Sequence, residues 1–317
     1  MPVAEKEDVP KVGHPIFSRH ETFPPRNGWL KKGFDAIKAD PEVFNREDAA
    51  ILLGVGKNMA KAIRYWCLAF KLVEEKTDKA TRTKTLVPTL FGNSLLGKNG
   101  WDPYLEDVGS LWLLHWELLK RPGLATTWDF AFNQYRHPEF TQDDFLNELS
   151  EYAKQTWPDT SFSEATLKND VSCFARMYSK DDVSKNVSEE TISSPFAELN
   201  LLTRLAGGKH LAFHIGSKKN LPIDVIAAAC FEYTDSCVTT ERSISISKLL
   251  YGIGSPGLAF KLPESTVYGA LDVLAAKRKD DLSISQTAGM IQLQFTKDPS
   301  KIASSILNDY YGSYRRT

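Results

Sequence analysis

The segment from Arg46 to Leu72 constrains the fold of this chain more than any other stretch of its 317 residues. Its sequence, REDAAILLGVGKNMAKAIRYWCLAFKL, predicts a short helix over 47–53, a tight turn at Gly54 and a second helix directly afterwards. Apolar side chains recur at spacings of 4, 3 and 4 along the second helix and predict its buried face: Met59, Ile63, Trp66 and Phe70. Another face carries cations at spacings of 4 and 3: Lys57, Lys61 and Arg64. The segment therefore predicts a helix-turn-helix.

The basic face of the second helix suggests a nucleic-acid contact. A helix that buries one face and offers cations on another can enter a major groove and meet phosphates at its rim. We expect this helix to supply the following DNA-binding residues: Lys57, Asn58, Lys61, Arg64 and Tyr65. The alternative is a solvated face on an ordinary helical hairpin, because most charge runs are no more than that.

The residues after the second helix predict a hairpin of two short strands. Residues 74–80 are polar and charged, and residues 81–85 alternate threonine with basic side chains, a pattern typical of a half-exposed strand. Arg82 and Lys84 would point the same way from their strand, toward backbone phosphates of DNA. A helix-turn-helix followed by such a hairpin is a winged helix. The alternative is a plain surface hairpin.

Composition limits the class of protein. With 317 residues, 42% of them hydrophobic and 25% charged, the chain suits two or three globular domains. No apolar run approaches the ~20 residues of a membrane span, and the N-terminus lacks the apolar core of an export signal. The four cysteines lack the spacing of a zinc site. We therefore expect reduced thiols in a cytoplasmic protein that does not contact a membrane.

The net charge of −1 conceals an asymmetry along the chain. Residues 1–100 hold 17 Lys and Arg against 12 Asp and Glu, whereas the remainder holds 22 against 28. A basic N-terminal part and an acidic remainder fit a nucleic-acid module joined to a protein-contact module.

We predict a mainly α (α+β), multi-domain chain with winged helix-turn-helix units at its N-terminal and C-terminal ends. The expected divisions are a disordered tail over 1–15, a winged-helix DNA-binding domain over 16–100, a helical domain with an acidic surface over 101–195, and a second winged-helix-like domain over 196–317. Within them we expect helices over 29–39, 105–120, 163–178, 222–233 and 263–277, a polar linker over 179–195 and a two-stranded wing over 283–295.

The best cluster of carboxylates is Asp102, Glu106 and Asp107. Asp102 and Glu106 lie one helical turn apart and could share a divalent cation, Mg²⁺ or Mn²⁺, that polarises a phosphate and activates water. The alternative is structural: Asp102 caps the helix that follows, while Glu106 and Asp107 offset the helix dipole. The structural interpretation is favoured because caps of this kind are common.

His20 is the other catalytic candidate. It could act as a general base while Arg26 holds the phosphate. It could equally pack between Phe17 and Phe23 as a hydrogen-bonded structural residue, and this second interpretation is favoured.

The remaining histidines give weaker signals. His115 lies on an apolar helix between two tryptophans and is predicted to be a core histidine. His210 and His214 could bind a metal from a helix, but the residues around them suit a strand or turn equally well. No PD…(D/E)xK, GIY-YIG or HNH nuclease pattern is present in the sequence.

Three blocks of sequence resemble a known bacterial family. HETFPPRNGWLKKG (20–33), LGVGKNMAKAIRYW (53–66) and DPYLEDVGSLWLLHW (102–116) are together similar to a family encoded beside DNA phosphorothioation genes, which includes the SspB-type component of single-strand phosphorothioation systems. The resemblance covers most of the first 200 residues and continues more loosely to the end. It implies a role in antiphage defence, in which sulfur replaces a backbone phosphate oxygen, and it implies DNA nicking. The partners that it implies are a cysteine desulfurase, an ATP-pyrophosphatase-like sulfur transferase and an ATPase.

The leading hypothesis is thus a DNA-binding component of a phosphorothioation system that nicks double-stranded DNA. A non-catalytic scaffold or regulator with tandem winged helices is the alternative. A ligand-sensing transcription factor, which would require a defined operator, is a third class. The sequence does not determine the catalytic residues, the metal or the oligomeric state.

Overall fold

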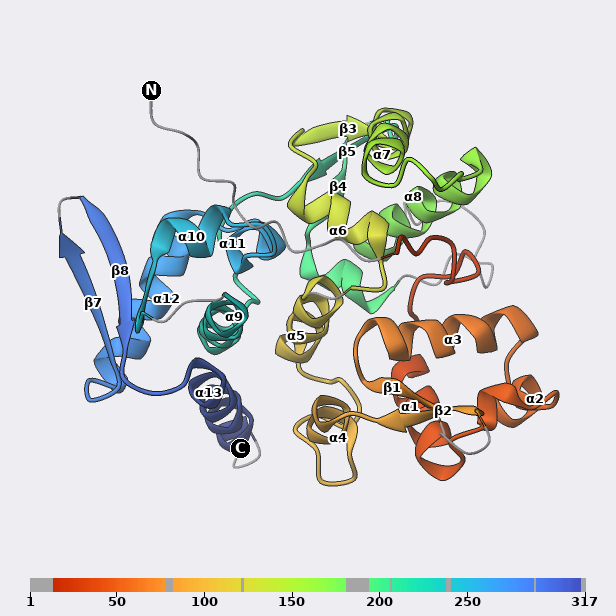
Figure 1. Cartoon of the computed structure of the whole chain (residues 1–317), viewed down its shortest axis with the longest axis horizontal. Coiled ribbons are helices and arrows are strands. Elements are labelled where there is room, and N and C mark those ends of the chain that lie inside the picture. Colours follow the sequence, from red (N-terminus) through yellow and green to blue (C-terminus); the bar gives the residue numbers. More distant parts are fainter. Residues whose placement is uncertain are drawn as a thin grey trace.

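The computed structural model describes residues 14–77, 82–120, 123–180, 194–205, 207–237, 241–287 and 289–314. Over this part the chain is mainly α, with three small antiparallel sheets (Figure 1). Most of the predicted tail (1–15) and of the predicted linker (179–195) lies outside the described residues. None of the described helices has the length and apolar character that a membrane crossing requires.

The first group of elements contains the predicted helices and hairpin. Its bounds are α1 (Trp29–Ala39), a 3-10 turn (Val43–Asn45), α2 (Ala49–Leu53), α3 (Lys57–Ala69), β1 (Val73–Thr77), β2 (Lys84–Pro88) and α4 (Leu90–Leu96). Gly54 ends α2 in the left-handed conformation (φ +62°), which costs glycine little. Gly33 of α1 allows α3 to approach closely, because a Cβ there would lie 2.6 Å from Cγ2 of Ile63.

The second group combines helices with a three-stranded sheet. Its bounds are α5 (Val108–Leu119), α6 (Thr126–Asn133), β3 (Glu139–Thr141), α7 (Gln142–Thr156), α8 (Glu164–Tyr178), a 3-10 turn (Pro195–Leu199), β4 (Leu202–Arg204) and β5 (His210–Phe213). The sheet order is β3-β5-β4. His210 lies in β5 opposite Thr141, so the helix that would have aligned His210 with His214 for a metal is absent there. His214 instead donates a hydrogen bond from Nδ1 to the carbonyl oxygen of Asn200 (3.2 Å).

The third group also combines helices with a three-stranded antiparallel sheet. Its bounds are α9 (Ile223–Ser236), β6 (Ser243–Ser245), α10 (Ile246–Tyr251), α11 (Pro256–Phe260), α12 (Glu264–Lys277), β7 (Leu282–Thr287), β8 (Met290–Phe295) and α13 (Pro299–Tyr314). The sheet order β6-β8-β7 matches that of the second group, since the first strand pairs with the last one in both. The predicted helix over 263–277 and the two strands within 283–295 are confirmed.

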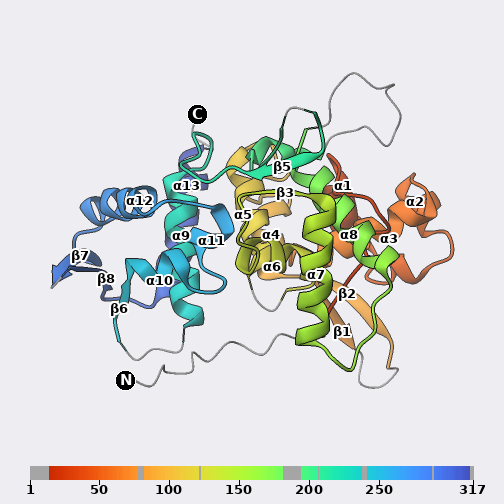
Figure 2. The same ribbon diagram turned by 90° about the horizontal axis from the view of Figure 1, so that it is seen from above.

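Helix α5 lies between the groups. Figures 1 and 2 show the third group on one side of α5 and the first two groups on the other. The helix packs against α6, α9 and α11. Its His115 is fully buried, with Nδ1 2.7 Å from the hydroxyl of Tyr178 and Nε2 2.9 Å from the carbonyl oxygen of Ala259. Burial lowers the pKa of His115 to about 4. The prediction of a core histidine is confirmed.

Candidate nucleic-acid interface

Helix α3 separates its charges from its buried face as the sequence predicts. Ile63, Trp66 and the cap residue Phe70 are fully buried, and Met59 is partly buried against the core. Lys57, Asn58 and Lys61 are exposed on the other face, and Arg64 is partly exposed. The spacing of the apolar residues places them on the side of α3 that meets α1.

The beginning of α3 adds a second feature that suits an anion. Gly56 occupies the N-cap position and provides no side-chain acceptor for the first amides of the helix. Lys57 and Asn58 directly follow it and are exposed. Amide N–H groups at a helix N-terminus, with a neighbouring cation, favour a phosphate oxygen.

The hairpin carries cations next to the same helix, and one carboxylate links the two elements. Nη2 of Arg64 lies 2.5 Å from Oε1 of Glu75 on β1, and Nζ of Lys84 on β2 lies 3.6 Å from Oε2 of that residue. Lys61 is paired in the same way with Glu21, at 3.4 Å. The basic surface therefore contains its own counter-ions. Because these pairs are exposed, each contributes only ~0–1 kcal/mol and can exchange for a phosphate.

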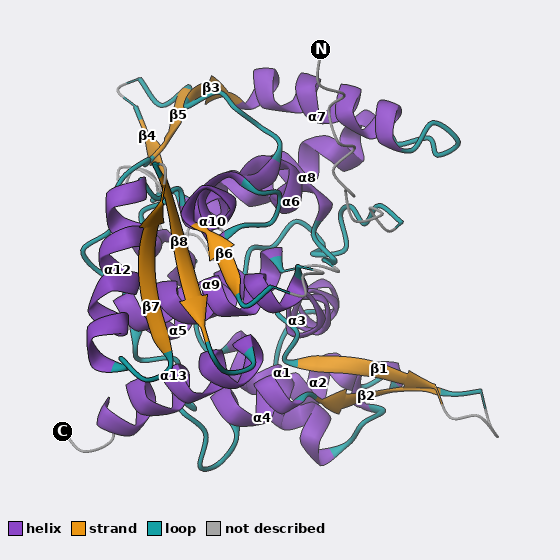
Figure 3. Ribbon diagram, turned by 60° about the vertical axis from the view of Figure 1, so that its left-hand side comes forward, coloured by secondary structure: helices purple, strands orange, loops and turns teal. Residues whose placement is uncertain are grey.

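The other predicted DNA-binding residues differ in how far they are exposed to solvent. Arg82 is exposed in the loop that joins β1 to β2, at the far end of a hairpin that extends away from the helices in Figure 3, and β2 begins only at Lys84, so Arg82 does not share a strand with Lys84 as predicted. Arg26 is partly exposed and lies over the rings of Phe23 and Trp29, at 5.4 and 5.2 Å from their centroids. Tyr65 is only 7% exposed, and its hydroxyl donates to the carbonyl of Leu124. Tyr65 is buried because α3 contacts the core over a wider part of its circumference than the face predicted from Met59, Ile63, Trp66 and Phe70.

Asp102 organises the turn before α5 instead of capping that helix. Its Oδ1 accepts from the backbone N–H of Glu106 (3.0 Å), and its Oδ2 accepts from the N–H of Asp107 (2.9 Å) and the hydroxyl of Ser110 (2.7 Å). The helix begins at Val108, three residues later than predicted, and Asp107 is its N-cap. The expectation that Asp102 caps the helix is wrong because the chain turns through a positive φ at residue 105 before the helix can begin.

The three carboxylates do not converge on one point. Asp102 and Asp107 are buried, whereas Glu106 is exposed. Oδ1 of Asp107 accepts from the N–H of Gly109, and Oδ2 accepts from the hydroxyl of Tyr310 at 2.6 Å. Across the described residues, no group of three or more His, Cys, Asp and Glu side chains is arranged to hold a metal ion.

His20 forms a buried pair that the sequence does not indicate. Its Nε2 lies 2.7 Å from Oδ1 of Asp170 on α8, and its Nδ1 accepts from the N–H of Thr22 at 3.1 Å. The other oxygen of Asp170 accepts from the hydroxyl of Thr127 (2.7 Å). Both ring nitrogens of His20 are thus engaged, and the residue is fully buried. The arrangement supports the structural interpretation of His20. The sequence feature that could have indicated this pair is Asp170, a charged residue at a position of α8 where the pattern calls for an apolar one.

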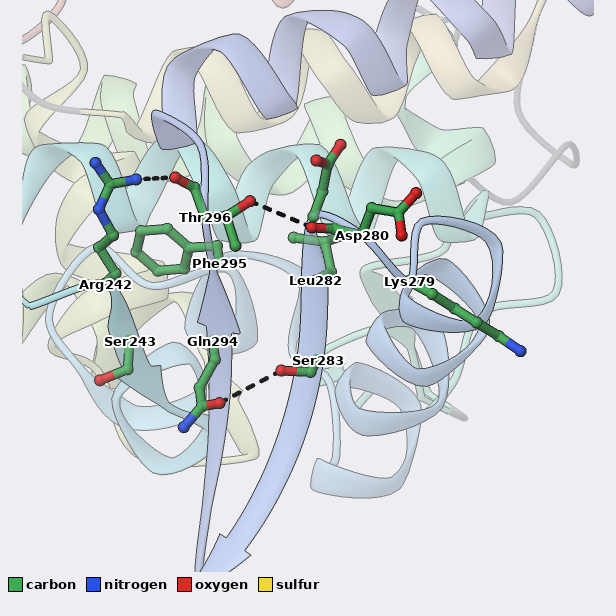
Figure 4. Close-up of a pocket in the computed structure, with 10 residues that line it drawn as sticks. Arg242, Ser243, Lys279, Asp280, Leu282, Ser283, Gln294, Phe295 and Thr296 are labelled. Atoms are coloured by element: carbon green, nitrogen blue, oxygen red, sulfur yellow. Dashed lines mark hydrogen bonds between the residues drawn. The ribbon is translucent and has the colours of Figure 1, made fainter.

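A cavity of about 400 Å³ lies elsewhere, at the base of the third sheet (Figure 4). Arg242, Lys279, Asp280 and Asp281 line it together with neighbouring strand residues. Asp281 is paired with Lys297 at 2.9 Å. None of the residues that the sequence singled out lines this cavity, so it adds nothing to the predicted site.

Comparison with known proteins identifies the family. The model of the family described as "Protein of unknown function (DUF4007)" matches residues 17–311. A magnesium ion-bound SspB crystal structure is 36% identical over 96% of this chain and 90% of that chain, with a TM-score of 0.89. Another SspB crystal structure is 37% identical over 97% and 91%, also with a TM-score of 0.89. No curated protein matches the chain. The chain therefore belongs to the DUF4007 family, and the predicted SspB-type membership is confirmed.

Proposed function

We propose that this chain is the DNA-binding component of a DNA phosphorothioation system and that it nicks DNA so that sulfur can enter the backbone. The observation that carries the DNA-binding part is the exposed basic face of α3, which adjoins an uncapped helix N-terminus and a hairpin with Lys84 on its second strand. The phosphorothioation part rests on the likeness to SspB. The sulfur-transfer proteins named above are the expected partners.

We propose further that each of the three groups of elements is a winged-helix unit. In the first group α2, α3 and the hairpin β1–β2 would be the helix-turn-helix and wing. In the second and third groups, a helix and a strand precede the helices α7 and α8, or α10, α11 and α12, which a pair of strands follows, and the first strand pairs with the last. The expected boundary at 195/196 then moves to follow Phe213, because Glu139 of β3 pairs with Ala212 of β5.

In this proposal α3 enters the major groove, and the cations around it meet phosphates on both sides. Lys57 and Lys61 extend directly from the exposed face of the helix. Arg64 and Lys84 exchange Glu75 for a phosphate when DNA arrives, which releases a carboxylate to water. The contacts are mostly to the backbone, so we expect binding that tolerates many sequences.

The test of DNA binding uses charge reversal on α3. Lys57→Glu, Lys61→Glu and Arg64→Glu should each weaken binding of a fluorescent duplex, measured by anisotropy, by about tenfold at low salt. Lys154→Glu, on the exposed face of α7, is the matched control and should bind like the wild type. Unchanged affinity in all three α3 variants would remove α3 from the DNA interface.

Nicking needs its own test because the described residues assemble no metal site by themselves. Mg²⁺ commonly binds through one or two carboxylates and completes its coordination shell with water and substrate phosphates. The exposed Glu106 would supply such a carboxylate once DNA is bound. We expect highly purified protein to convert supercoiled plasmid to open circle with Mg²⁺ or Mn²⁺ and to lose this activity in EDTA. A persistent absence of nicking with every metal, together with intact DNA binding, would favour the non-catalytic scaffold.

A further inference from the structure

The third sheet ends in an unusual edge strand. Strand β7, Leu282–Thr287 with the sequence LSISQT, is hydrogen-bonded to β8 and to no other strand among the described residues. Figure 3 shows it at the outer side of the order β7-β8-β6. It has neither a charged residue nor a proline, the two devices that commonly protect an edge strand from pairing.

The other edges in the described part of the chain are protected or short. The hairpin β1–β2 contains Glu74, Glu75, Lys76 and Lys84 and ends at Pro88. The edge strands β3, β4 and β6 are each three residues long. Strand β7, with six residues, therefore offers the longest uncharged edge among them.

The ladder between β7 and β8 shows which backbone groups of β7 point outward. Thr296 donates its N–H to the carbonyl of Asp281 at 3.0 Å, so this carbonyl points toward β8, while the N–H of Asp281 donates to the carbonyl of Arg278 at 2.9 Å. Along an antiparallel strand, the N–H and C=O groups of successive residues point to opposite sides. The N–H and C=O groups of Leu282, Ile284 and Gln286 therefore point away from β8. Of these three outward N–H groups, that of Leu282 donates to the carbonyl of Arg278 (2.9 Å), and among the described residues those of Ile284 and Gln286 have no backbone acceptor.

The side chains of β7 are compatible with a second copy of the same strand. Ser283, Gln294 and Ser243 lie across the three strands on one face (Figure 4), and Ser285, Gln292 and Ser245 form the next row. The intervening row is apolar: Ile244, Leu293 and Ile284. An antiparallel copy centred on Ile284 would place Ile284 opposite itself and Ser283 opposite Ser285, so like meets like at the centre of the pairing, and Leu282 opposite Gln286 is the mixed pair at its ends.

We propose that β7 is a dimerisation edge, at which two copies of this chain join their sheets antiparallel about a two-fold axis through Ile284. Each copy then exchanges N–H and C=O hydrogen bonds at Ile284 and donates the N–H of Gln286 to the carbonyl of Leu282 of the second copy. The absence of charge along β7 means that no like-charge repulsion opposes this pairing. The proposal concerns the third group of elements and does not depend on the proposed DNA function.

The test is sedimentation velocity over a range of protein concentrations. The wild type should show a concentration-dependent monomer–dimer equilibrium. Gln286→Pro removes an outward N–H and no β8 hydrogen bond, so it should weaken dimerisation by about tenfold or more without changing the circular dichroism spectrum. Gln286→Thr retains the N–H and should dimerise like the wild type. A wild type that stays monomeric at ~100 μM, or an equally stable Gln286→Pro dimer, would overturn the proposal.

Cross-linking gives a second measurement that does not depend on proline. Ile284→Cys, in a Cys237→Ser background that removes the partly exposed native thiol, should form a covalent dimer with a short bis-maleimide. Ser243→Cys, on the opposite edge of the sheet, is the matched control and should remain monomeric. Equal cross-linking at both positions, or none at Ile284→Cys, would contradict pairing through β7.

Discussion

Asp102 offers the sharpest test of how the turn before α5 is held. Its carboxylate accepts the N–H groups of Glu106 and Asp107 on two different oxygens, and the hydroxyl of Ser110 as well. Asp102→Ala removes all of these acceptors. Leaving the buried N–H of Asp107 unsatisfied costs ~1–3 kcal/mol, and the other lost hydrogen bonds add ~1 kcal/mol. The expected total is ~2–4 kcal/mol, or a fall in Tm of roughly 3–6 °C for a chain of this length.

Asp102→Asn should lie between Ala and the wild type. An ordinary N-cap tolerates asparagine about as well as aspartate, but here both carboxylate oxygens accept, and an asparagine NH₂ would face a donor. We therefore expect a loss of ~1–2 kcal/mol. The assay is thermal and urea unfolding, with Glu106→Ala as the exposed control, which should change stability by less than ~0.5 kcal/mol. An Asp102→Ala protein as stable as this control would refute the reasoning. A fully stable Asp102→Asn protein that has lost nicking would instead indicate a metal ligand.

Three further predictions follow from individual side chains. Glu75→Gln removes the carboxylate that neutralises two cations, so DNA affinity in a low-salt anisotropy titration should rise by up to about tenfold, and an unchanged or weaker affinity would count against this surface. His20→Ala removes one donor from the buried carboxylate of Asp170, which keeps its hydrogen bonds from Ser18 and Thr127, and should cost ~1–3 kcal/mol in urea unfolding; near-normal stability would contradict the structural role. Because burial lowers the pKa of His115 to about 4, the unfolded chain binds the extra proton between about pH 6.5 and pH 4, and stability falls as pH falls through this window. His115→Gln should reduce that fall by up to ~3 kcal/mol, and an unchanged pH dependence of urea unfolding would argue against a neutral His115.

Local patterns were sufficient to predict much of the first and third groups. The apolar spacing in α3 identified its buried face, and alternation over 283–295 identified β7 and β8, because both signals depend on neighbours in sequence. The start of α5 was predicted three residues early. The DPYLED block contains good helix formers, and a turn with a positive φ at residue 105 leaves no compositional mark. Strands β4 and β5, at three and four residues, are too short to show a period.

The candidate sites were harder to predict because they depend on long-range contacts. His20 and Asp170 are 150 positions apart, and no sequence spacing shows that they pair. Tyr65 lies between the basic and apolar faces of α3. Its side chain turns inward, where its hydroxyl donates to the carbonyl of Leu124, a residue 59 positions away in sequence. Glu75 was visible as an acidic residue in a basic hairpin, but its contact with Arg64 depends on how the hairpin folds back toward α3.

The salt dependence of DNA binding tests the central claim most directly. If the basic face of α3 meets phosphates, log Kd for a duplex should rise linearly with log salt concentration, and each lost phosphate contact should reduce the slope by about 0.9. We predict a reduction of about 1 for Lys57→Gln and for Lys61→Gln, and no change for Lys154→Gln on α7. Identical slopes for the wild type and both α3 variants would contradict DNA binding by this helix.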